Sequence, residues 1–247
     1  MKYLHIYDRM HPEYSNAKTP DHEFVYYEDL VGATIDPNNT TLVKEDCHSD
    51  VFLRLYLRLL NQKHNFCSHV LYMRHRAKLQ QFILTDAAMN IQPTLEQFVK
   101  IIDNADYVWR RLIELDDLDS YTTHVNFLNY SGGFSFNNKD ALTGSHLARY
   151  FEWNDPSRYY FTTWQLDTCL YEESRKAKMT GTHFCPNIIV VPDISVGNAI
   201  YKCLMKEYDC FGFVVGGDTI GILNSRSDLD KNYESIKILE EIRANND

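Results

Sequence analysis

The chain has 247 residues, of which 44% are hydrophobic and 24% charged, so it can bury a sizeable core in one large domain or two small ones. Its formal net charge is −9 and its lysines and arginines are scattered, which argues against nucleic acid or a membrane surface as a partner. Any anionic ligand therefore needs a local pocket of Arg, Lys or backbone N–H groups.

The beginning of the chain, residues 1–8, has a short apolar strand pattern and no apolar stretch long enough for a signal peptide or a membrane span. We therefore expect the protein in the cytoplasm. Its six cysteines form no C-x-x-C pair, so reduced thiols are expected. The tightest histidine cluster, His69 to His75, lacks a carboxylate or cysteine at metal-ligand spacing, and we predict no metal site.

The first third of the chain predicts short strands and one helix. Apolar runs at 3–7, 24–27 and 41–43 alternate with polar segments and indicate strands joined by loops. The dense apolar run from Val51 to Leu60 predicts a largely buried helix, with Ser49 or Asp50 as its N-cap. Two strands are then expected at 68–73 and 81–84, with the basic stretch 74–78 as their turn.

The clearest helix begins after Pro93. Thr94 and Gln97 have capping-box spacing, and the apolar residues from Leu95 to Ile113 hold a period of about 3.6 residues. This register places Trp109 in the core, as a buried anchor rather than a ligand platform.

Strands and helices alternate through the rest of the chain. We expect strands at 124–128, 159–162, 187–191, 210–215 and 220–223, and helices at 139–153, 166–178, 196–207 and 230–242. The run 187–191 is continuously apolar, as expected of a strand covered on both faces. The order predicts an α/β fold with a largely parallel sheet and helices on both faces.

Three loops after strong strands are candidate sites, because ligands of open α/β sheets bind beyond the carboxyl ends of strands. In Pro192 to Asn198, Gly197 permits close approach and the helix N-terminus offers N–H groups to an anion; the alternative is an ordinary N-cap by Asp193 or Ser195. The second loop is Gly216-Gly217-Asp218.

The third loop is Ser225-Arg226-Ser227-Asp228. Here Arg226 can hold a phosphate by a forked contact, and Asp228 or Asp230 can act as a general base; the alternative is a solvated turn. The chain has no Walker loop, no G-x-G-x-x-G, no G-x-S-x-G and no H-E-x-x-H, so none of these loops identifies a reaction by itself.

Taken together, the segments resemble the phosphate acetyl/butyryltransferase family. Residues 188–228 resemble its carboxy-terminal motifs L-x-V-P-D-I-E-A-G-N-x-x-Y-K, G-x-x-x-G-A and V-L-T-S-R-A-D-S. Residues 84–97 resemble L-T-D-A-A-x-N-I-x-P-T-L-E-x, and Ser68 to Val70 is similar to S-H-V. Residues 44–54 look like a divergent K-G-x-x-x-T-x-x-F-L-R.

This resemblance implies a fold like that of isocitrate and isopropylmalate dehydrogenases, with two α/β lobes around a cleft, in a homodimer. The first lobe would hold residues 1–92 and 217–247, shortened on its N-terminal side, and the second would hold 93–216.

It also implies a reaction, the transfer of an acyl group between coenzyme A and inorganic phosphate. A base removes the thiol proton of CoA, the thiolate attacks the acyl carbonyl, and phosphate leaves, without a covalent acyl-enzyme. Coenzyme A is then a substrate, with acyl-CoA and phosphate or acyl phosphate as the small-molecule partners.

Matching the motifs position by position gives the site residues. Ser225, Arg226 and Asp228 correspond to the catalytic S-R and D of the family, and Arg54 to the arginine of F-L-R. The substrate-binding candidates are Arg54, Lys44, Ser49, Gly197, Asn198 and Gly216.

Two motifs depart from the family pattern. Glu45 replaces a glycine, and a buried carboxylate beside an anion pocket would repel phosphate. The family's D-G-P-L-x-L-D appears as Phe161 to Asp167 and keeps only its last part. The alternative function is therefore a catalytically weakened relative that binds CoA, acyl phosphate or a partner protein.

Overall fold

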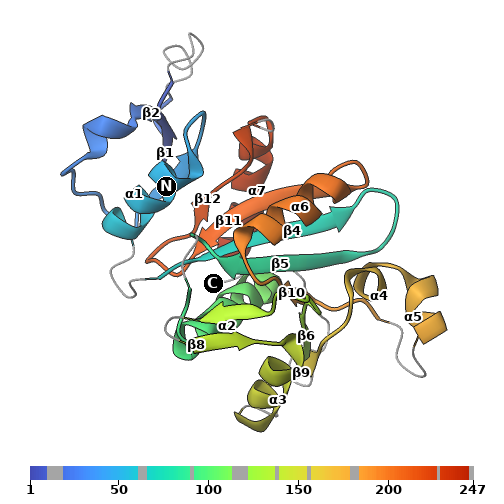
Figure 1. The fold of residues 1–247 in the computed structure, drawn as a ribbon. Coiled ribbons are helices and arrows are strands. Elements are labelled where there is room, and N and C mark those ends of the chain that lie inside the picture. The colour runs from blue at the N-terminus through green and yellow to red at the C-terminus, as the bar shows by residue number, and fades with distance from the viewer. Residues whose placement is uncertain are drawn as a thin grey trace. The chain divides into compact units, whose positions relative to one another are not determined.

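The computed structural model describes residues 1–9, 19–60, 66–89, 92–112, 122–136, 139–154, 157–178, 184–226 and 229–244 (Figure 1). The chain forms two compact units: unit 1 contains Met1–Val70 and Phe211–Asp247, and unit 2 contains Leu71–Cys210. The lobes predicted from the sequence, 1–92 with 217–247 and 93–216, stay a prediction. The compact units divide earlier in the chain at both boundaries.

Unit 1 is built on the strands β2 (His22–Tyr26), β1 (Lys2–Tyr7), β3 (Thr40–Lys44), β12 (Gly221–Ile222) and β11 (Tyr208–Val215), in that spatial order. The first four run parallel, whereas β11 is antiparallel to β12. Its helices are the short η2 (Tyr27–Leu30), α1 (Ser49–Leu59) and α7 (Lys231–Ala244).

Helix α1 follows the apolar pattern that predicted it. Phe52, Leu53, Leu55, Tyr56 and Leu59 are buried and recur at three- and four-residue spacing. The predicted N-cap was wrong, because the helix begins at Ser49 and the cap position falls on His48, whose backbone is extended and whose side chain makes no capping hydrogen bond.

Unit 2 holds the strands β4 (Ser68–His75), β5 (Gln81–Ala87), β10 (Ile188–Val190), β6 (Thr123–Phe127) and β9 (Tyr159–Thr162), in that spatial order. β5, β10, β6 and β9 run parallel. A hairpin of β7 (Phe134–Phe136) and β8 (Lys139–Leu142) is added. The helices are α2 (Leu95–Leu112), α3 (Gly144–Asn154), α4 (Leu166–Leu170), α5 (Glu172–Lys178) and α6 (Ile194–Leu204).

The predicted α/β class with largely parallel strands is confirmed, and so is the start of α2. The Thr94 N–H donates to Gln97 Oε1 at 3.0 Å, and the Gln97 N–H donates to Thr94 Oγ1 at 3.2 Å. This is a complete capping box. Trp109 is 3% exposed, in agreement with its predicted place in the core. β10 is fully buried, as its continuous apolar run predicted.

Two predicted helices are shorter than expected. Residues 139–142 form the strand β8, and α3 begins only at Gly144, where the Thr143 hydroxyl accepts from the His146 N–H. The predicted helix 166–178 is divided at Tyr171, whose backbone is extended. Arg175 fixes this break, because its Nη1 donates to the last carbonyls of α4, at 2.6 Å from Cys169 O.

We expect one partly buried histidine, His124, to make the fold sensitive to acid. His124 Nε2 lies 2.7 Å from Thr162 Oγ1, and burial, with the charge of Arg175, lowers the pKa of His124 to about 4. The unfolded chain takes up this proton near pH 6.5, so the free energy of unfolding should fall by roughly 3 kcal/mol as the pH drops from about 6.5 to about 4. Urea denaturation across this pH range should show a smaller fall in the free energy of unfolding for His124→Asn than for the wild type. Equal falls in both proteins would contradict the assignment.

None of the described helices is long and apolar enough to cross a membrane.

Candidate functional site

The parallel strands β1, β3 and β12 of unit 1 end at the same edge of the sheet. Asp8 follows β1, the loop 44–48 follows β3, and the loop 223–226 follows β12. This edge is where ligands of open α/β sheets bind, and it collects Lys44, Ser225 and Arg226 of the sequence-predicted site.

Lys44 joins two of these loops. Its side chain is buried, and Nζ donates to Glu45 O at 3.4 Å and to Asn224 O at 3.1 Å. Burial lowers the pKa of Lys44, with a further lowering by the charge of Arg226. An ammonium group has three N–H donors, and two of them here hold the backbone of neighbouring loops. Lys44 therefore sets the spacing of the loops after β3 and β12.

Arg226 lies at the outer end of the same edge. Its side chain is 41% exposed, and Nη1 lies 3.9 Å from Asp46 Oδ1. An exposed ion pair at this separation is weak, so it leaves most of the five guanidinium donors to solvent or a ligand. Ser225 is partly buried beside it. Asp228, the predicted base, lies outside the described residues.

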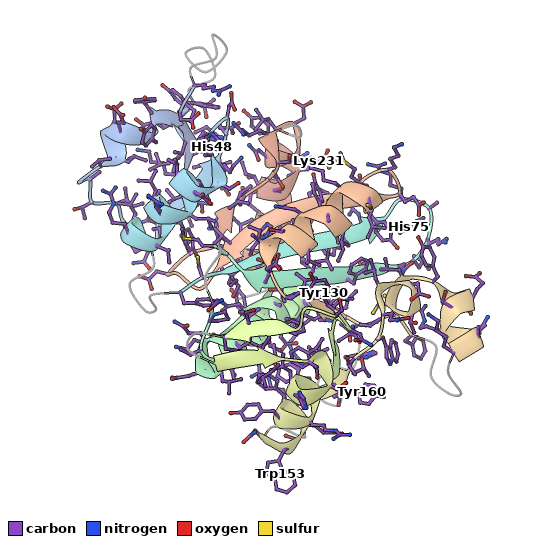
Figure 2. The ribbon with its side chains drawn as sticks, viewed as in Figure 1. His48, His75, Tyr130, Trp153, Tyr160 and Lys231 are labelled. Atoms are coloured by element: carbon purple, nitrogen blue, oxygen red, sulfur yellow. The ribbon has the colours of Figure 1, made fainter. Side chains whose placement is uncertain are left out.

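Helix α1 begins at this edge. Ser49 is its first residue, and the residue before it is His48, which is labelled in Figure 2. The His48 side chain makes no capping hydrogen bond. The His48 N–H donates to Asp8 Oδ2 at 3.2 Å. An α-helix N-terminus carries a partial positive charge, so this end of α1 favours an anion.

Glu45 has two hydrogen-bonding partners inside unit 1. Its Oε1 lies 2.7 Å from His5 Nδ1 and accepts from Asn232 Nδ2 at 2.9 Å. The carboxylate is 5% exposed and is turned to these two partners. The sequence predicted neither of these two partners, and the repulsion of phosphate by Glu45 stays a prediction.

A buried amide network continues from Glu45 beneath the loops. Asn232 Nδ2 also donates to Lys44 O at 2.9 Å, and Asn232 Oδ1 accepts from Asn224 Nδ2 at 2.9 Å. Asn224 Nδ2 donates further to Ser235 Oγ at 2.8 Å, and Asn224 Oδ1 accepts from the Gly212 N–H at 2.8 Å. Sequence reasoning missed His5, Asn224 and Asn232, although Asn224 directly precedes the Ser-Arg pair that drew attention to this loop.

Two other predicted residues of unit 1 lie on α1 and directly after β11. Arg54 is exposed in the middle of α1, and its approach to Arg226 stays a prediction. Gly216 directly follows β11, which is antiparallel to β12, so it lies at the opposite edge of the strands from Arg226. Gly216 has a φ of 120°, which favours glycine. The Gly217 N–H donates to Tyr56 Oη at 2.9 Å, so this glycine pair has a structural role beside α1.

Gly197 and Asn198 belong to unit 2, at the start of α6. Asp193 caps this helix by accepting from the Ser195 and Val196 N–H groups at 2.7 and 3.0 Å, which is the ordinary N-cap considered as an alternative. A Cβ atom on Gly197 would lie 2.9 Å from Asp86 Oδ2, so this glycine allows α6 to approach β5. Asn198 is exposed.

The altered motif at 161–167 makes structural contacts within unit 2. Asn126 Oδ1 accepts from Thr162 Oγ1 at 2.8 Å and from the Trp164 N–H at 2.6 Å. A hydrogen bond from Lys178 Nζ, at 2.5 Å, lowers the pKa of the exposed Asp167.

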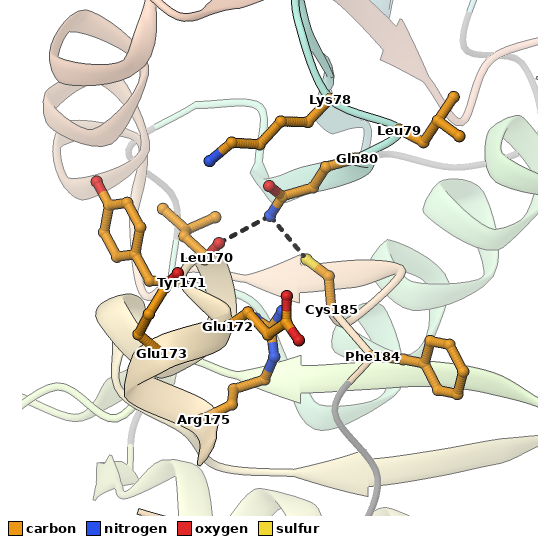
Figure 3. A pocket seen from close by; sticks show the side chains of 10 residues that line it. All are labelled: Lys78, Leu79, Gln80, Leu170, Tyr171, Glu172, Glu173, Arg175, Phe184 and Cys185. Atoms are coloured by element: carbon orange, nitrogen blue, oxygen red, sulfur yellow. Dashed lines mark hydrogen bonds between the residues drawn. The ribbon is translucent and has the colours of Figure 1, made fainter. Parts of the chain in front are cut away.

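A cavity of about 360 Å³ in unit 2 contains none of the predicted residues (Figure 3). It lies between the β4–β5 turn and the α4–α5 break, where Gln80 Nε2 donates to Leu170 O at 3.0 Å and to Cys185 Sγ at 3.6 Å.

Two buried thiols, those of Cys47 and Cys67, are poorly suited to nucleophilic chemistry. All six cysteines are free, and burial raises the pKa of Cys47 and of Cys67 to about 12, so both are protonated near neutral pH. Among the described residues, no group of three or more His, Cys, Asp or Glu side chains is placed to hold a metal ion.

Comparison with known proteins gives one family match and several similar structures. The sequence matches the family described as phosphate acetyl/butaryl transferase over residues 47–242. A branched-chain phosphotransacylase from Enterococcus faecalis V583 has a TM-score of 0.68 and 24% identity, covering 98% of this chain and 99% of that chain. A phosphotransacetylase from Streptococcus pyogenes has a TM-score of 0.57 and 18% identity, covering 84% of this chain and 63% of that one, less than two thirds of its length. No curated protein matched.

Proposed function

The chain belongs to the phosphate acetyl/butaryl transferase family, and we propose that it transfers a short-chain acyl group between coenzyme A and inorganic phosphate. The observation that carries this proposal is the edge of unit 1 where Arg226, the N-terminus of α1 and the buried Lys44 meet. These groups supply the positive potential that a phosphate needs, on a protein whose net charge is −9.

The proposed reaction starts from acyl phosphate and CoA. A base takes the proton of the CoA thiol, the thiolate forms a bond to the acyl carbonyl carbon, and the bond from that carbon to the phosphate oxygen breaks. Inorganic phosphate leaves with the electron pair of that bond. We place the phosphate against Arg226 and the Ser49 end of α1, where the guanidinium and the helix N–H groups stabilise the charge that develops on the leaving oxygen.

Ser225 stands beside Arg226 and is proposed to contact the reacting thiol or the phosphate. Asp228 is the proposed base, with Asp230, which is exposed just before α7, as the alternative. Arg54 remains a candidate contact of the phosphate or of the acyl carbonyl. Gly197 and Asn198 remain substrate-binding candidates.

A coupled assay tests the proposal directly. CoA-dependent breakdown of acetyl, butyryl and branched-chain acyl phosphates is measured beside a thermal shift with CoA. Turnover of one of these substrates is expected. A thermal shift without turnover would favour the catalytically weakened binder, and neither signal would contradict both functions.

We also propose a homodimer, because the chain carries 13% aromatic residues that can furnish an apolar interface. Light scattering at micromolar concentration is expected to give twice the mass of the chain. A monomer at that concentration would contradict it.

A further inference from the structure

A continuous line of hydrogen bonds runs from the surface of unit 1 to the loop that follows β3. His22 Nδ1 lies 2.9 Å from His5 Nε2, and His5 Nδ1 lies 2.7 Å from Glu45 Oε1. Glu45 Oε1 accepts from Asn232 at 2.9 Å. His5 is fully buried, whereas His22 is partly exposed. Neighbouring strands β2 and β1 bring the two imidazoles together, and β3 leads into Glu45.

The ends of this line fix where its protons lie. An ionised carboxylate only accepts, so His5 donates through Nδ1–H, and a neutral His5 then presents Nε2 as an acceptor to the Nδ1–H of His22. A single hydrogen bond between two imidazoles holds one proton. If His5 and His22 were both protonated, two N–H groups would face each other and this bond would break.

The surroundings of His22, taken together, oppose its protonation, because burial outweighs the nearby carboxylates. His5 is packed between the rings of Phe24, His22 and Tyr233, and Glu45 is the carboxylate that it contacts. His22 stacks on Tyr3 at 5.1 Å and lies near Tyr233, with the carboxylates of Asp21 and Glu240 also facing it. Burial, and then the neighbouring His5, lower the pKa of His22.

The other end of the line reaches the candidate site through Asn232. Asn232 Nδ2 donates to Glu45 Oε1 and to Lys44 O, and Asn232 Oδ1 accepts from Asn224 Nδ2. The backbone carbonyl of Asn224 accepts in turn from Lys44 Nζ. Asn224 is two residues before Arg226, and Glu45 directly precedes Asp46, the ion-pair partner of Arg226. A displaced Glu45 carboxylate would therefore move both loops that carry Arg226 and its partner.

We propose that Glu45, His5 and Asn232 are positioning residues that hold the loops 44–46 and 224–226 for phosphate binding, and that double protonation of the His5–His22 pair releases them. This inference rests on the proposed function, because it takes phosphate as the ligand of these loops. It gives the glutamate that replaces the family's glycine a role at the site.

The variant Glu45→Gln distinguishes this positioning role from simple repulsion, because the two predict opposite changes in the affinity for phosphate. Gln keeps the size of the side chain and an oxygen acceptor but removes the charge that orients His5. If Glu45 only repelled the ligand, its loss would tighten phosphate binding. If it positions the loops, we expect phosphate to bind about tenfold more weakly, the effect of losing one charge-assisted hydrogen bond.

The matched control is Glu23→Gln, which makes the same change of charge in unit 1 at a surface ion pair with Lys2. Affinity for inorganic phosphate is measured by calorimetry near neutral pH for the wild type and both variants, with a thermal melt of each. Glu23→Gln should bind like the wild type. Equal or tighter binding by Glu45→Gln would overturn the inference, whereas a wild type that binds no phosphate would instead reject the proposed function.

If Glu45→Gln is too unstable to study, the His22→Phe variant still tests the inference. Phe retains an aromatic ring that can stack on Tyr3, so this variant should fold. Nitrogen NMR of the imidazoles in the wild type should show His5 with its proton on Nδ1. Phosphate affinity should fall more steeply toward acid in the wild type than in His22→Phe, and the titration of phosphate itself is common to both proteins. Parallel pH profiles of phosphate affinity in the two proteins would contradict the inference. A His5 proton on Nε2 would contradict the proposed line of hydrogen bonds.

Discussion

Replacing Arg226 by lysine is expected to lower turnover about a hundredfold, which corresponds to roughly 2.7 kcal/mol of transition-state stabilisation. The guanidinium is planar and grips two phosphate oxygens at once, which an ammonium group does not reproduce. The side chain is 41% exposed and its partner Asp46 is 3.9 Å away, so it supports little packing. Thermal stability should therefore remain nearly unchanged.

The control for this experiment is Arg76→Lys in unit 2. Arg76 is also about half exposed and also pairs with an aspartate, Asp209, at 3.1 Å, but it contributes nothing to the candidate site. Its replacement should leave turnover of acyl phosphate unaltered. If Arg226→Lys kept full activity, the site would lie on another loop. If activity fell only in step with the melting temperature, Arg226 would be a structural ion-pair partner of Asp46.

The sequence predicted best those features that are encoded within a few residues. The capping box of Thr94 and Gln97 and the N-cap of Asp193 each lie within one helical turn, and each forms in the structure. The Ser-Arg pair was found because the loop follows an apolar strand. In each case the interacting groups are near neighbours in the chain, so a local pattern is enough to place them.

The network around Glu45 could not be predicted in this way. His5, Glu45 and Asn232 are separated by 40 and 187 residues, and they meet only because β1 and β3 are adjacent and α7 packs near their ends. From sequence, a carboxylate next to a predicted anion pocket indicates repulsion. In the folded chain, the same carboxylate is buried and lies within hydrogen-bonding distance of His5 and Asn232.

The position of Gly216 could have been inferred more closely. The strands predicted at 210–215 and 220–223 are separated by only a few residues, whereas a parallel crossover requires about a dozen or more. The two strands must therefore be antiparallel, and the loop that joins them lies at the opposite edge from the loop after 223. The structure has this arrangement, with Val214 opposite Gly221. A resemblance in motif order therefore does not show which edge of a sheet a residue occupies.

Replacing Gly212 by alanine is expected to lower the free energy of unfolding by about 3 kcal/mol or more, the upper range for overpacking. An added Cβ would lie 2.0 Å from Leu223 O and 2.9 Å from Leu223 C, and both are backbone atoms that cannot rotate away. The backbone at Leu223, directly after β12, must move instead. That movement stretches the bonds from the Leu223 N–H to Gly212 O and from the Gly212 N–H to Asn224 Oδ1, both 2.8 Å long.

Urea denaturation of Gly212→Ala measures this loss, and Gly32→Ala is its control. Gly32 has no atom within 4 Å of an added Cβ, so its replacement meets only the cost of a φ of 87°, about 1 kcal/mol. Because Asn224 carries the carbonyl that holds Lys44, the Gly212 variant should also lose phosphate affinity under conditions in which it remains folded. Equal small losses of stability in the two variants would show that β12 can shift without strain, and the loop 223–226 would then be less firmly fixed than these contacts require.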